Sequence, residues 1–493
     1  MNFENLRTVD NRTLAFTLSP IHVTYANTLR RLMLTGVETV AFRSDMTSTG
    51  STTDVVVKRN DTPMTNEMLA DRIGLVPINV TDPLSWKADK YVFSLKVAGG
   101  KDNTTYVKSG DFKVYEVKGL AGGANSVNSN SGSNSNSNNN NENENENENE
   151  EENNGNNNEN NNENNNENNN ASNSGSNNGN NSGSNNENEE DLVEVPVERF
   201  FPPNPITRDT CLIATLQPGS GPTQQVVEIR AKATKGTGRE HARFCPVSQC
   251  SYEYTPDSDP QRIQEMFTTW LNVAKKAGSV DKGSERYNEL LREFNTMQVK
   301  RCYKINEKNE PYSFDFTVET AGVLPVNYIV ERACEVGENM CSRYVNINRG
   351  ELPAEMNVSA SDSRIIGFDF LIRGHDHTLG NLLQTWLVEN HIQGEATPKI
   401  TYAGYSVPHP LRDEMILRIG VEDGEEATAR LALAEAAKGC VEMFQQLRAS
   451  WRAVIGAPAL PQVAKTTAPS VAAKTGVRRK TPRVAPRVAP AKK

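Results

Sequence analysis

The residues of this sequence that could bind a metal ion are few, and their spacing does not suit the task. Cys245 and Cys250 are separated by four residues, but no second cysteine pair lies nearby. A structural zinc site needs about four closely arranged ligands. The run His375-Asp376-His377 has ligand-type side chains, but it stands at the start of a predicted helix, where capping is the better use. The sequence therefore predicts no metal and no cofactor.

The sequence also lacks the motifs of phosphate-binding loops and of nucleophilic catalysis. Gly99-Gly100-Lys101 and Gly236-Thr237-Gly238 lack the Gly-x4-Gly-Lys-Ser/Thr spacing of a phosphate-binding loop. Neither a Gly-x-Ser-x-Gly nor a His-Glu-x-x-His motif occurs, and no nucleophile stands beside a credible base. A free-standing enzyme is therefore the least favoured function.

Composition divides the chain of 493 residues into a body and two strongly biased segments. Residues 121–190 contain 13 glutamates and no lysine, arginine or aspartate, and the rest is almost only Asn, Ser and Gly. Such a tract cannot bury enough apolar surface to fold, so we expect a disordered surface loop. Residues 456–493 contain nine Lys and Arg and no acidic residue. The remaining body is mildly acidic, which excludes nucleic-acid binding by its bulk charge.

The cysteines and the N-terminus indicate an intracellular protein. Seven cysteines, an odd number, are scattered along the chain, which is typical of reduced thiols rather than of a disulfide framework. The first residues show no signal-peptide pattern, and no run of about 18 apolar residues occurs. We therefore expect no membrane association and an intracellular location.

One segment occurs twice, at a constant offset of 350 residues. Residues 28–35 (TLRRLMLT) align with residues 378–385 (TLGNLLQT). An alternating segment precedes each copy, at 14–18 and 366–370, and is typical of a strand with one buried face. Each copy then carries an apolar helical stripe, formed by Ala26, Leu29, Leu32 and Met33 in the first and by Leu379, Leu382, Leu383, Trp386 and Leu387 in the second.

The elements around these copies repeat as well. The expected N-caps are Thr24 in the first copy and Asp376 or Thr378 in the second. Further strand-like runs lie at 225–231, 313–319, 399–402 and 415–420, and long helical patterns lie at 326–344 and 433–451. The chain thus holds two α+β units of similar plan, strand, helix, strands and long helix. Two similar units in one chain suggest a pseudo-twofold pair that shares a helical interface.

At this point the motifs resemble a known family, the α-subunit-like assembly subunits of cellular RNA polymerases. Residues 26–34 with 36–41, 72–78 (RIGLVPI), 236–247 (GTGREHARFCPV) and 316–322 resemble, in order, segments of the third-largest subunit of eukaryotic polymerase II and of its archaeal counterpart. Residues 376–383 (DHTLGNLL) and 404–410 (GYSVPHP) resemble the smaller partner, which is subunit eleven in eukaryotes and has its own archaeal counterpart. The resemblance covers most of residues 1–455, and such a fusion is similar to what large DNA viruses of eukaryotes encode.

The resemblance implies an α+β fold in which two α-subunit-type dimerisation units form an intramolecular pseudo-dimer. An inserted β-rich domain with a disordered loop interrupts the first unit. The expected parts are the larger unit at 1–80 and 223–345, the inserted domain at 81–222, a linker at 346–363, the smaller unit at 364–455 and a disordered basic tail at 456–493. Relatives often carry a cysteine cluster in the inserted domain, whereas this sequence has only Cys211 there. We therefore expect no metal in that domain.

The resemblance also implies a non-catalytic role in transcription, as an assembly scaffold of a multisubunit DNA-dependent RNA polymerase. The implied partners are the second-largest and largest subunits and the small polymerase subunits, with DNA reached only through the assembled complex. No homo-oligomer is expected. The expected interface residues are Asn27, Thr28, Leu29, Arg30, Arg31, Asp376, His377, Thr378, Leu379, Gly380 and Asn381.

Some of these residues have alternative interpretations. By the family pattern the helix with Arg30 and Arg31 faces the second-largest subunit, where guanidinium groups could pair with carboxylates. From the residues alone, both arginines would be solvated surface groups. Asn27 and Asn381 either cap or bridge backbone at the seam between the units or lie on exposed polar faces.

The alternative function is an architectural nucleic-acid-binding protein that acts through its basic tail. It predicts steeply salt-dependent DNA binding that is lost when residues 456–493 are deleted. The run Arg478-Arg479-Lys480 would also suit a nuclear localisation signal. If the chain is viral, as the fused arrangement suggests, the expected location is the cytoplasm or the nucleus of the host cell, and packaging in the virion is the alternative.

Overall fold

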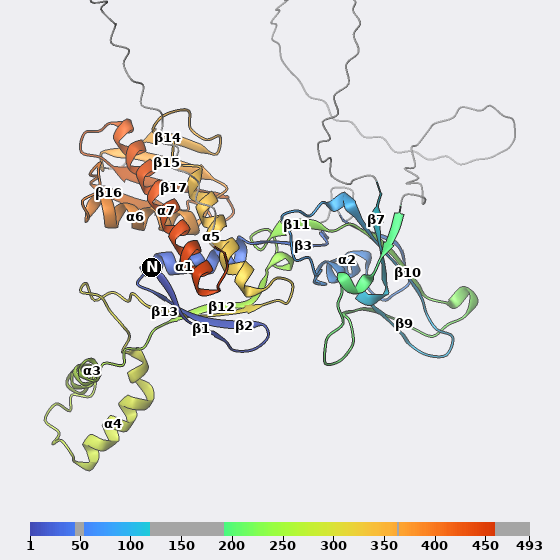
Figure 1. The fold of residues 1–493 in the computed structure, drawn as a ribbon, viewed down its shortest axis with the longest axis horizontal. Helices are drawn as coiled ribbons and strands as arrows, with labels where there is room; N and C mark the ends of the chain where they lie inside the picture. The colour runs from blue at the N-terminus through green and yellow to red at the C-terminus, as the bar shows by residue number, and fades with distance from the viewer. Residues whose placement is uncertain (45–53, 119–191, 362–363, 459–493) are drawn as a thin grey trace, which may run out of the picture. The chain divides into compact units, whose positions relative to one another are not determined.

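The computed structural model describes residues 1–44, 54–118, 192–361 and 364–458, which form two compact units (Figure 1). Unit 1 comprises Met1–Ala41, Leu75–Trp86 and the described residues from Lys235 onward. Unit 2 comprises the described residues of Phe42–Gly74 and Lys87–Thr234. The Asn/Glu-rich tract and almost all of the basic tail, both predicted to be disordered, lie outside the described residues.

The first part of unit 1, here called the larger half, is a four-stranded antiparallel sheet with helices α1 and α5. The strand order is β1-β2-β13-β12, and the elements are β1 (Asn2–Thr8), β2 (Thr13–Ser19), α1 (Val23–Thr35), β12 (Val247–Tyr254), β13 (Phe314–Thr320) and α5 (Val326–Ser342). The predicted alternation over 14–18 does form strand β2. Its register places Phe16 opposite Phe316, and the two rings stack with centroids 5.2 Å apart.

The second part of unit 1, here called the smaller half, repeats this plan. The strand order is β14-β15-β17-β16, and the elements are β14 (Met356–Ala360), β15 (Gly367–Arg373), α6 (His377–Leu387), β16 (Tyr402–Ser406), β17 (Glu414–Gly420) and α7 (Glu426–Val454). Strand β14 takes the place that β1 has in the larger half. It lies inside the stretch 346–363 that was expected to be a linker, so the smaller half begins before residue 364. Strand β16 begins where the predicted run 399–402 ends.

One continuous hydrophobic core joins the two halves. Helix α5 packs against α7, α1 packs against α5 and α6, and α6 packs against α7. The predicted helical stripes are confirmed, because Leu29 and Met33 of α1 and Leu379 and Leu383 of α6 are fully buried. Trp386, also predicted on the α6 stripe, is only half-buried. The apolar periodicity therefore identified the faces that meet in the core.

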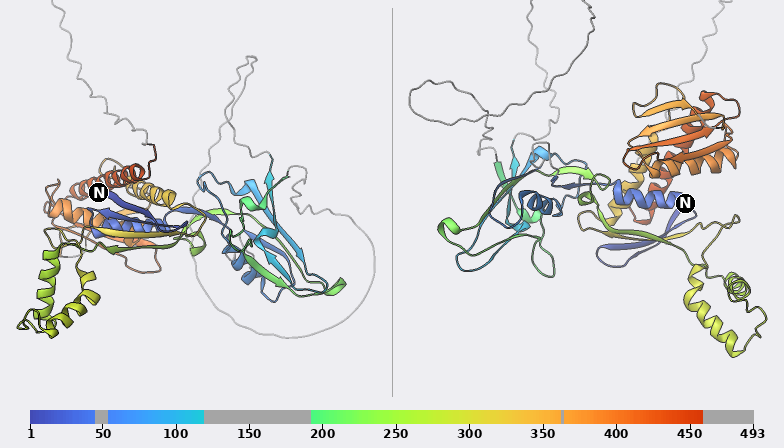
Figure 2. Two further views of the ribbon diagram at one scale, coloured as in Figure 1. Left: turned by 60° about the horizontal axis from the view of Figure 1, so that its bottom comes forward. Right: turned by 180° about the vertical axis from the view of Figure 1, so that it is seen from behind.

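A helical hairpin that was not predicted stands between β12 and β13. It consists of α3 (Pro260–Val273) and α4 (Glu285–Met297), with Asp259 and Ser284 as N-caps. Its own small core is formed by Phe267, Leu271, Leu290 and Phe294. Both views in Figure 2 show the hairpin extending away from the strands of the larger half.

Unit 2 is rich in strands, as was expected of the inserted domain. Its main sheet has the strand order β4-β10-β5-β7-β8, formed by β4 (Val55–Asn60), β10 (Val226–Ala231), β5 (Tyr91–Ala98), β7 (Phe112–Val117) and β8 (Leu192–Val195). The unit also contains a two-stranded sheet of β6 (Thr105–Lys108) and β9 (Leu212–Leu216), and helix α2 (Asn66–Gly74). Strand β10 pairs with both β4 and β5. The unit therefore reaches beyond the expected range 81–222 at both ends, because these pairings hold β4 and β10 in one sheet.

None of the described helices is both long and apolar enough to cross a bilayer. No group of three or more His, Cys, Asp or Glu within the described ranges is placed to hold a metal ion.

Candidate subunit interface

Helix α1 carries the first group of predicted interface residues, 27–31. Its N-cap is His22, whose Nδ1 accepts a hydrogen bond from the backbone N–H of Thr24 at 3.2 Å. The prediction that Thr24 is the cap was wrong. An imidazole nitrogen without a proton is a hydrogen-bond acceptor, so it can replace the usual side-chain oxygen. The Thr24 hydroxyl instead accepts a hydrogen bond from Thr385 Oγ1 of α6, at 3.1 Å.

Helix α6 carries the second group of predicted residues. Asp376 is its N-cap, as predicted, and its Oδ1 accepts from the backbone N–H of Thr378 at 2.8 Å. Burial favours a higher pKa for Asp376, but the hydrogen bonds from Thr378 and the charges of Arg239 and Arg31 outweigh it and lower the pKa. The carboxylate is thus ionised at neutral pH. Its negative charge also interacts favourably with the positive, N-terminal end of the dipole of α6.

Arg31 connects the two groups. Its Nε donates a hydrogen bond to Thr378 Oγ1 at 2.8 Å, and its Nη2 lies 3.3 Å from Asp376 Oδ2. The side chains of this ion pair are 35% and 36% exposed. The guanidinium is therefore held by the smaller half of the same chain, whereas the family pattern implied a contact with a separate subunit.

Arg30 has different neighbours, although it is adjacent in sequence. Its Nε donates to Asn27 Oδ1 at 3.0 Å, and both residues line a cavity of about 600 Å³ together with residues 250–254 of β12. Asn27 is half-buried and bonds a side chain, so it matches neither of its two interpretations. Among the described residues Arg30 has no ion pair, which leaves its guanidinium available to a carboxylate from outside the chain.

The other predicted residues belong mostly to the core. Those that are buried are Thr28, Leu29, Thr378, Leu379 and Gly380. Gly380 lies under the ring of Tyr405, where an added Cβ would be 2.4 Å from Cδ2, so a larger residue does not fit. His377 is exposed, with Nδ1 3.2 Å from Tyr405 Oη, and Asn381 is half-buried. Direct contact with another protein is therefore open to only part of the predicted set.

Ion pairs along α5 and α7 were not predicted. Arg448 lies 3.5 Å from Glu331 and 3.8 Å from Glu335, and Arg452 also pairs with Glu331. These side chains are 17–32% exposed, so water screens them less than ordinary surface pairs. The acidic residues of α5 recur at helical spacing, and this spacing was the feature of the sequence that could have indicated a charged face on the helix. The sequence did not reveal which helix faces them.

Where α5 packs against α7, a small residue on one helix faces a large side chain on the other. An added Cβ on Gly337 of α5 would lie 2.6 Å from Cε1 of Phe444 on α7, so the glycine makes room for that ring. Trp451 is fully buried, with its ring centroid 5.0 Å from Phe3 and 5.2 Å from Phe16. The last turns of α7 thus pack on the sheet of the larger half.

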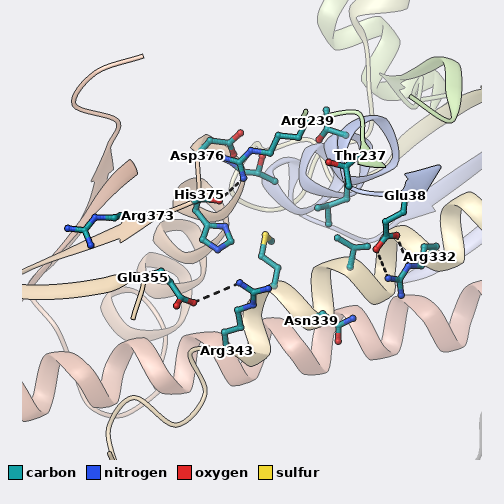
Figure 3. A pocket seen from close by; sticks show the side chains of 17 residues that line it. Glu38, Thr237, Arg239, Arg332, Asn339, Arg343, Glu355, Arg373, His375 and Asp376 are labelled. Atoms are coloured by element: carbon teal, nitrogen blue, oxygen red, sulfur yellow. Dashed lines mark hydrogen bonds and ion pairs between the residues drawn. The ribbon is translucent and has the colours of Figure 1, made fainter. Parts of the chain in front are cut away.

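A cavity of about 740 Å³ opens beside α1, α5 and the connection between β15 and α6 (Figure 3). Its polar lining is Glu38, Thr237, Arg239, Arg332, Asn339, Arg343, Glu355, Arg373, His375, Asp376 and Thr378. On one wall Arg332 and Glu38 form an ion pair, with Arg332 Nη2 and Glu38 Oε1 2.8 Å apart. Both halves contribute side chains, so the cavity exists only when the halves are packed together.

The chain matches two models of one protein family. Residues 15–341 match a model described as the RNA polymerase Rpb3/Rpb11 dimerisation domain. Residues 368–450, in the smaller half, match a second model with the same description. Both matches agree with the order of the motifs along the chain.

Curated relatives are subunits of RNA polymerases. The chain is 28% identical to DNA-directed RNA polymerases I and III subunit RPAC1 of Homo sapiens over 153 residues, which are 28% of this chain and 42% of the relative. It is 32% identical to DNA-directed RNA polymerase subunit Rpo11 of Thermococcus kodakarensis over 87 residues, 18% of this chain and 85% of the relative. The chain therefore spans about two fifths of the length of RPAC1 and most of Rpo11.

These matches fall on different parts of the molecule. The first model spans the larger half from β2 to α5, together with the inserted unit 2, and the second spans β15 to α7 of the smaller half. A dimerisation domain is a structural and not a catalytic module. Because the first model spans well over half of its residues, the chain belongs to the RNA polymerase Rpb3/Rpb11 dimerisation-domain family.

Proposed function

We propose that this chain is a non-catalytic assembly subunit of a multisubunit DNA-dependent RNA polymerase. The observation that carries the proposal is the packing of α5 against α7, because each belongs to a different family-matched half. A dimerisation domain whose counterpart is in the same chain is paired at a high effective concentration. The two halves then act as an intramolecular pseudo-dimer and need no second copy.

The proposed partners are the second-largest and largest polymerase subunits, which dock on the outer surface of unit 1, and small polymerase subunits. Two features support this. The names of the relatives describe polymerase subunits. Arg30 on α1 also stands beside an open cavity with its guanidinium free of any ion pair within the described ranges. Chemistry on nucleotides would then belong to the larger subunits.

The test is native mass measurement of the complex that co-purifies with the full, affinity-tagged chain. We expect the two largest polymerase subunits in that complex, identified by peptide mass spectrometry. Recovery of the chain without any polymerase subunit would contradict the proposal. DNA binding by the purified chain alone, steeply salt-dependent and lost when 456–493 is deleted, would favour the architectural alternative instead.

A viral source and packaging in particles form a separate proposal. The resemblance of the fused arrangement to that of large DNA viruses supports it. Antibody detection of the chain in purified particles would test packaging, and fractionation of producing cells would test whether the chain resides in the cytoplasm or the nucleus.

A further inference from the structure

Two cysteines, one from each half, meet where α5 packs against α7 (Figure 1). Cys341 of α5 and Cys440 of α7 are fully buried free thiols, and their side chains are in hydrogen-bond contact. Burial, followed by this contact, raises the pKa of the Cys440 thiol well above its ordinary value. The Cys440 side chain is therefore protonated at neutral pH while the two helices stay packed.

The contacts one helical turn away explain why these two thiols face each other. Gly337 precedes Cys341 by one turn and lies under the ring of Phe444, which follows Cys440 by one turn. Later residues of α5 thus meet earlier residues of α7, so the helices run antiparallel. Because Gly337 has no side chain, the two backbones approach closely here. A disulfide needs its two Cα atoms about 4–7 Å apart, which such an approach favours.

The other cysteines do not compete for this position. Cys440 is the only cysteine in the sequence after Cys341. Cys334 is also buried on α5, but it lies seven residues before Cys341, roughly 10 Å along the helix axis. Cys341 is therefore the α5 thiol that matches Cys440, and Cys334 is a built-in control.

The end of α5 gives an oxidant a route to the pair. A protonated thiol is a poor nucleophile, so the packed interface protects both cysteines. Cys341 is the last residue but one of α5, and the chain leaves the helix through turns at residues 343–348. Terminal turns of helices open more readily than helix interiors. Opening of this turn hydrates Cys341 first, because Cys440 lies in the middle of α7.

We propose that Cys341 and Cys440 form a reversible disulfide, which joins the two halves covalently when the chain meets a peroxide. The Cys341 sulfur attacks one peroxide oxygen, the O–O bond breaks, and a sulfenic acid and one water result. The Cys440 sulfur then attacks the sulfenic sulfur, the S–S bond forms, and the oxygen leaves as a second water. Two thiols and one hydrogen peroxide thus give one disulfide and two waters. A dithiol reductant reverses the reaction by thiol exchange.

The first experiment maps the bond in the full chain. The reduced protein is freed of reductant, treated with a small excess of hydrogen peroxide, alkylated and digested with trypsin without reduction. We expect peptides 333–343 and 439–448 to be joined, and to separate after treatment with dithiothreitol. Fragmentation of the joined peptide shows which cysteine of 333–343 carries the bond. A folded wild type that yields no joined peptide would overturn the proposal.

The matched control uses the second cysteine of the same peptide. Cys334→Ser should keep the joined peptide, whereas Cys341→Ser should lose it, and circular dichroism checks that both variants fold. A bond carried by Cys334, or one that persists in Cys341→Ser, would refute the assignment. The fragmentation of the wild-type peptide decides this even if a variant does not fold.

A second experiment asks whether the bond holds the halves together. A protease recognition site is inserted between Gly350 and Glu351, which are both exposed and lie between the two cysteines. After oxidation and cleavage, a denaturing gel without reductant should show the fragments joined, and reduction should separate them. Because Cys440 is the only cysteine beyond the cut, Cys440→Ser should separate without reduction. Separation of the oxidised wild-type fragments would contradict a covalent link.

The bond should also stabilise the native pairing of the halves. It closes a loop of about 100 residues and so restricts the unfolded chain. We expect oxidation to raise the melting temperature by at least about 4 °C in the wild type and to leave Cys341→Ser unchanged. An equal or lower melting temperature for the oxidised wild type would mean that the bond strains the packed helices, and the proposed role in joining the halves would fail.

Discussion

The Nε of Arg31 and the Oγ1 of Thr378 lie 2.8 Å apart, although 347 positions separate the two residues in the sequence. The contact joins the two copies of the repeated segment. It has no exact counterpart on the other side, because the second copy has Asn381 where the first has Arg31, and the Thr28 hydroxyl donates to the backbone oxygen of Thr24 in its own helix. The junction between the copies is therefore asymmetric and distinguishes the larger half from the smaller.

Replacing Arg31 tests whether this junction stabilises the fold. We expect Arg31→Ala to lower the free energy of unfolding by about 1 kcal/mol, since it removes one hydrogen bond to Thr378 and a half-exposed ion pair to Asp376. The matched control is Arg30→Ala, which should change stability by less than about 0.5 kcal/mol. Urea unfolding followed by circular dichroism measures both, and equal effects would contradict the assignment.

Gly337 tests the packing between α5 and α7. Alanine in a helix interior is normally favoured over glycine by about 1 kcal/mol. An added Cβ at this position would lie 2.6 Å from the ring of Phe444, which is fully buried. We therefore expect Gly337→Ala to destabilise the chain, by about 1–3 kcal/mol. Gly350→Ala is the control, because nothing lies within 4 Å of the added atom there. A gain in melting temperature for Gly337→Ala would count against the close fit.

The ion pairs between α5 and α7 can be tested by reversing their charges. Arg448→Glu plus Arg452→Glu places two acids beside Glu331 in a partly shielded site, and we expect a loss of about 2–3 kcal/mol. Adding Glu331→Arg to this variant restores opposite charges and should recover more than half of the loss. Lys438→Glu, on an exposed part of α7, is the control and should be nearly neutral. Failure of the third substitution to restore stability, measured by urea unfolding, would show that the charges do not pair as described.

His375 predicts a pH dependence of stability. Burial, followed by the charges of Arg239 and Arg343, lowers its pKa in the folded chain to about 4, below the ordinary 6.5, so the unfolded chain binds the proton more tightly. Stability should therefore fall as the pH drops from about 7 toward 4. Asp376, whose pKa is also lowered, adds a further loss only below its ordinary value of 3.8. We expect His375→Gln to remove about 1–2 kcal/mol of the loss between pH 7.5 and 5, with His409→Gln as an exposed control. Identical pH profiles for wild type and His375→Gln would exclude this role.

Local patterns in the sequence were sufficient to predict the main strands and helices of each half. Alternation over 14–18 and 366–370 predicted strands β2 and β15, and helical spacing identified the buried faces of α1 and α6. The prediction of Asp376 as an N-cap is confirmed. Capping could be predicted because it depends only on a side chain and on a backbone N–H two residues further along the chain. The short strand β14 was missed because its polar residues and the neighbouring Gly, Pro, Asn and Ser suggested a linker.

Only the tertiary structure decided which charged groups meet. The sequence showed two adjacent arginines but could not show that Arg31 is held by Asp376 while Arg30 stays free of ion pairs among the described residues. It likewise could not place Arg343, Arg373 and His375 around one cavity, because they lie on different elements. Periodicity reports which face of an element is buried, and it carries no information about which distant element covers that face. That depends on how the two halves pack against each other.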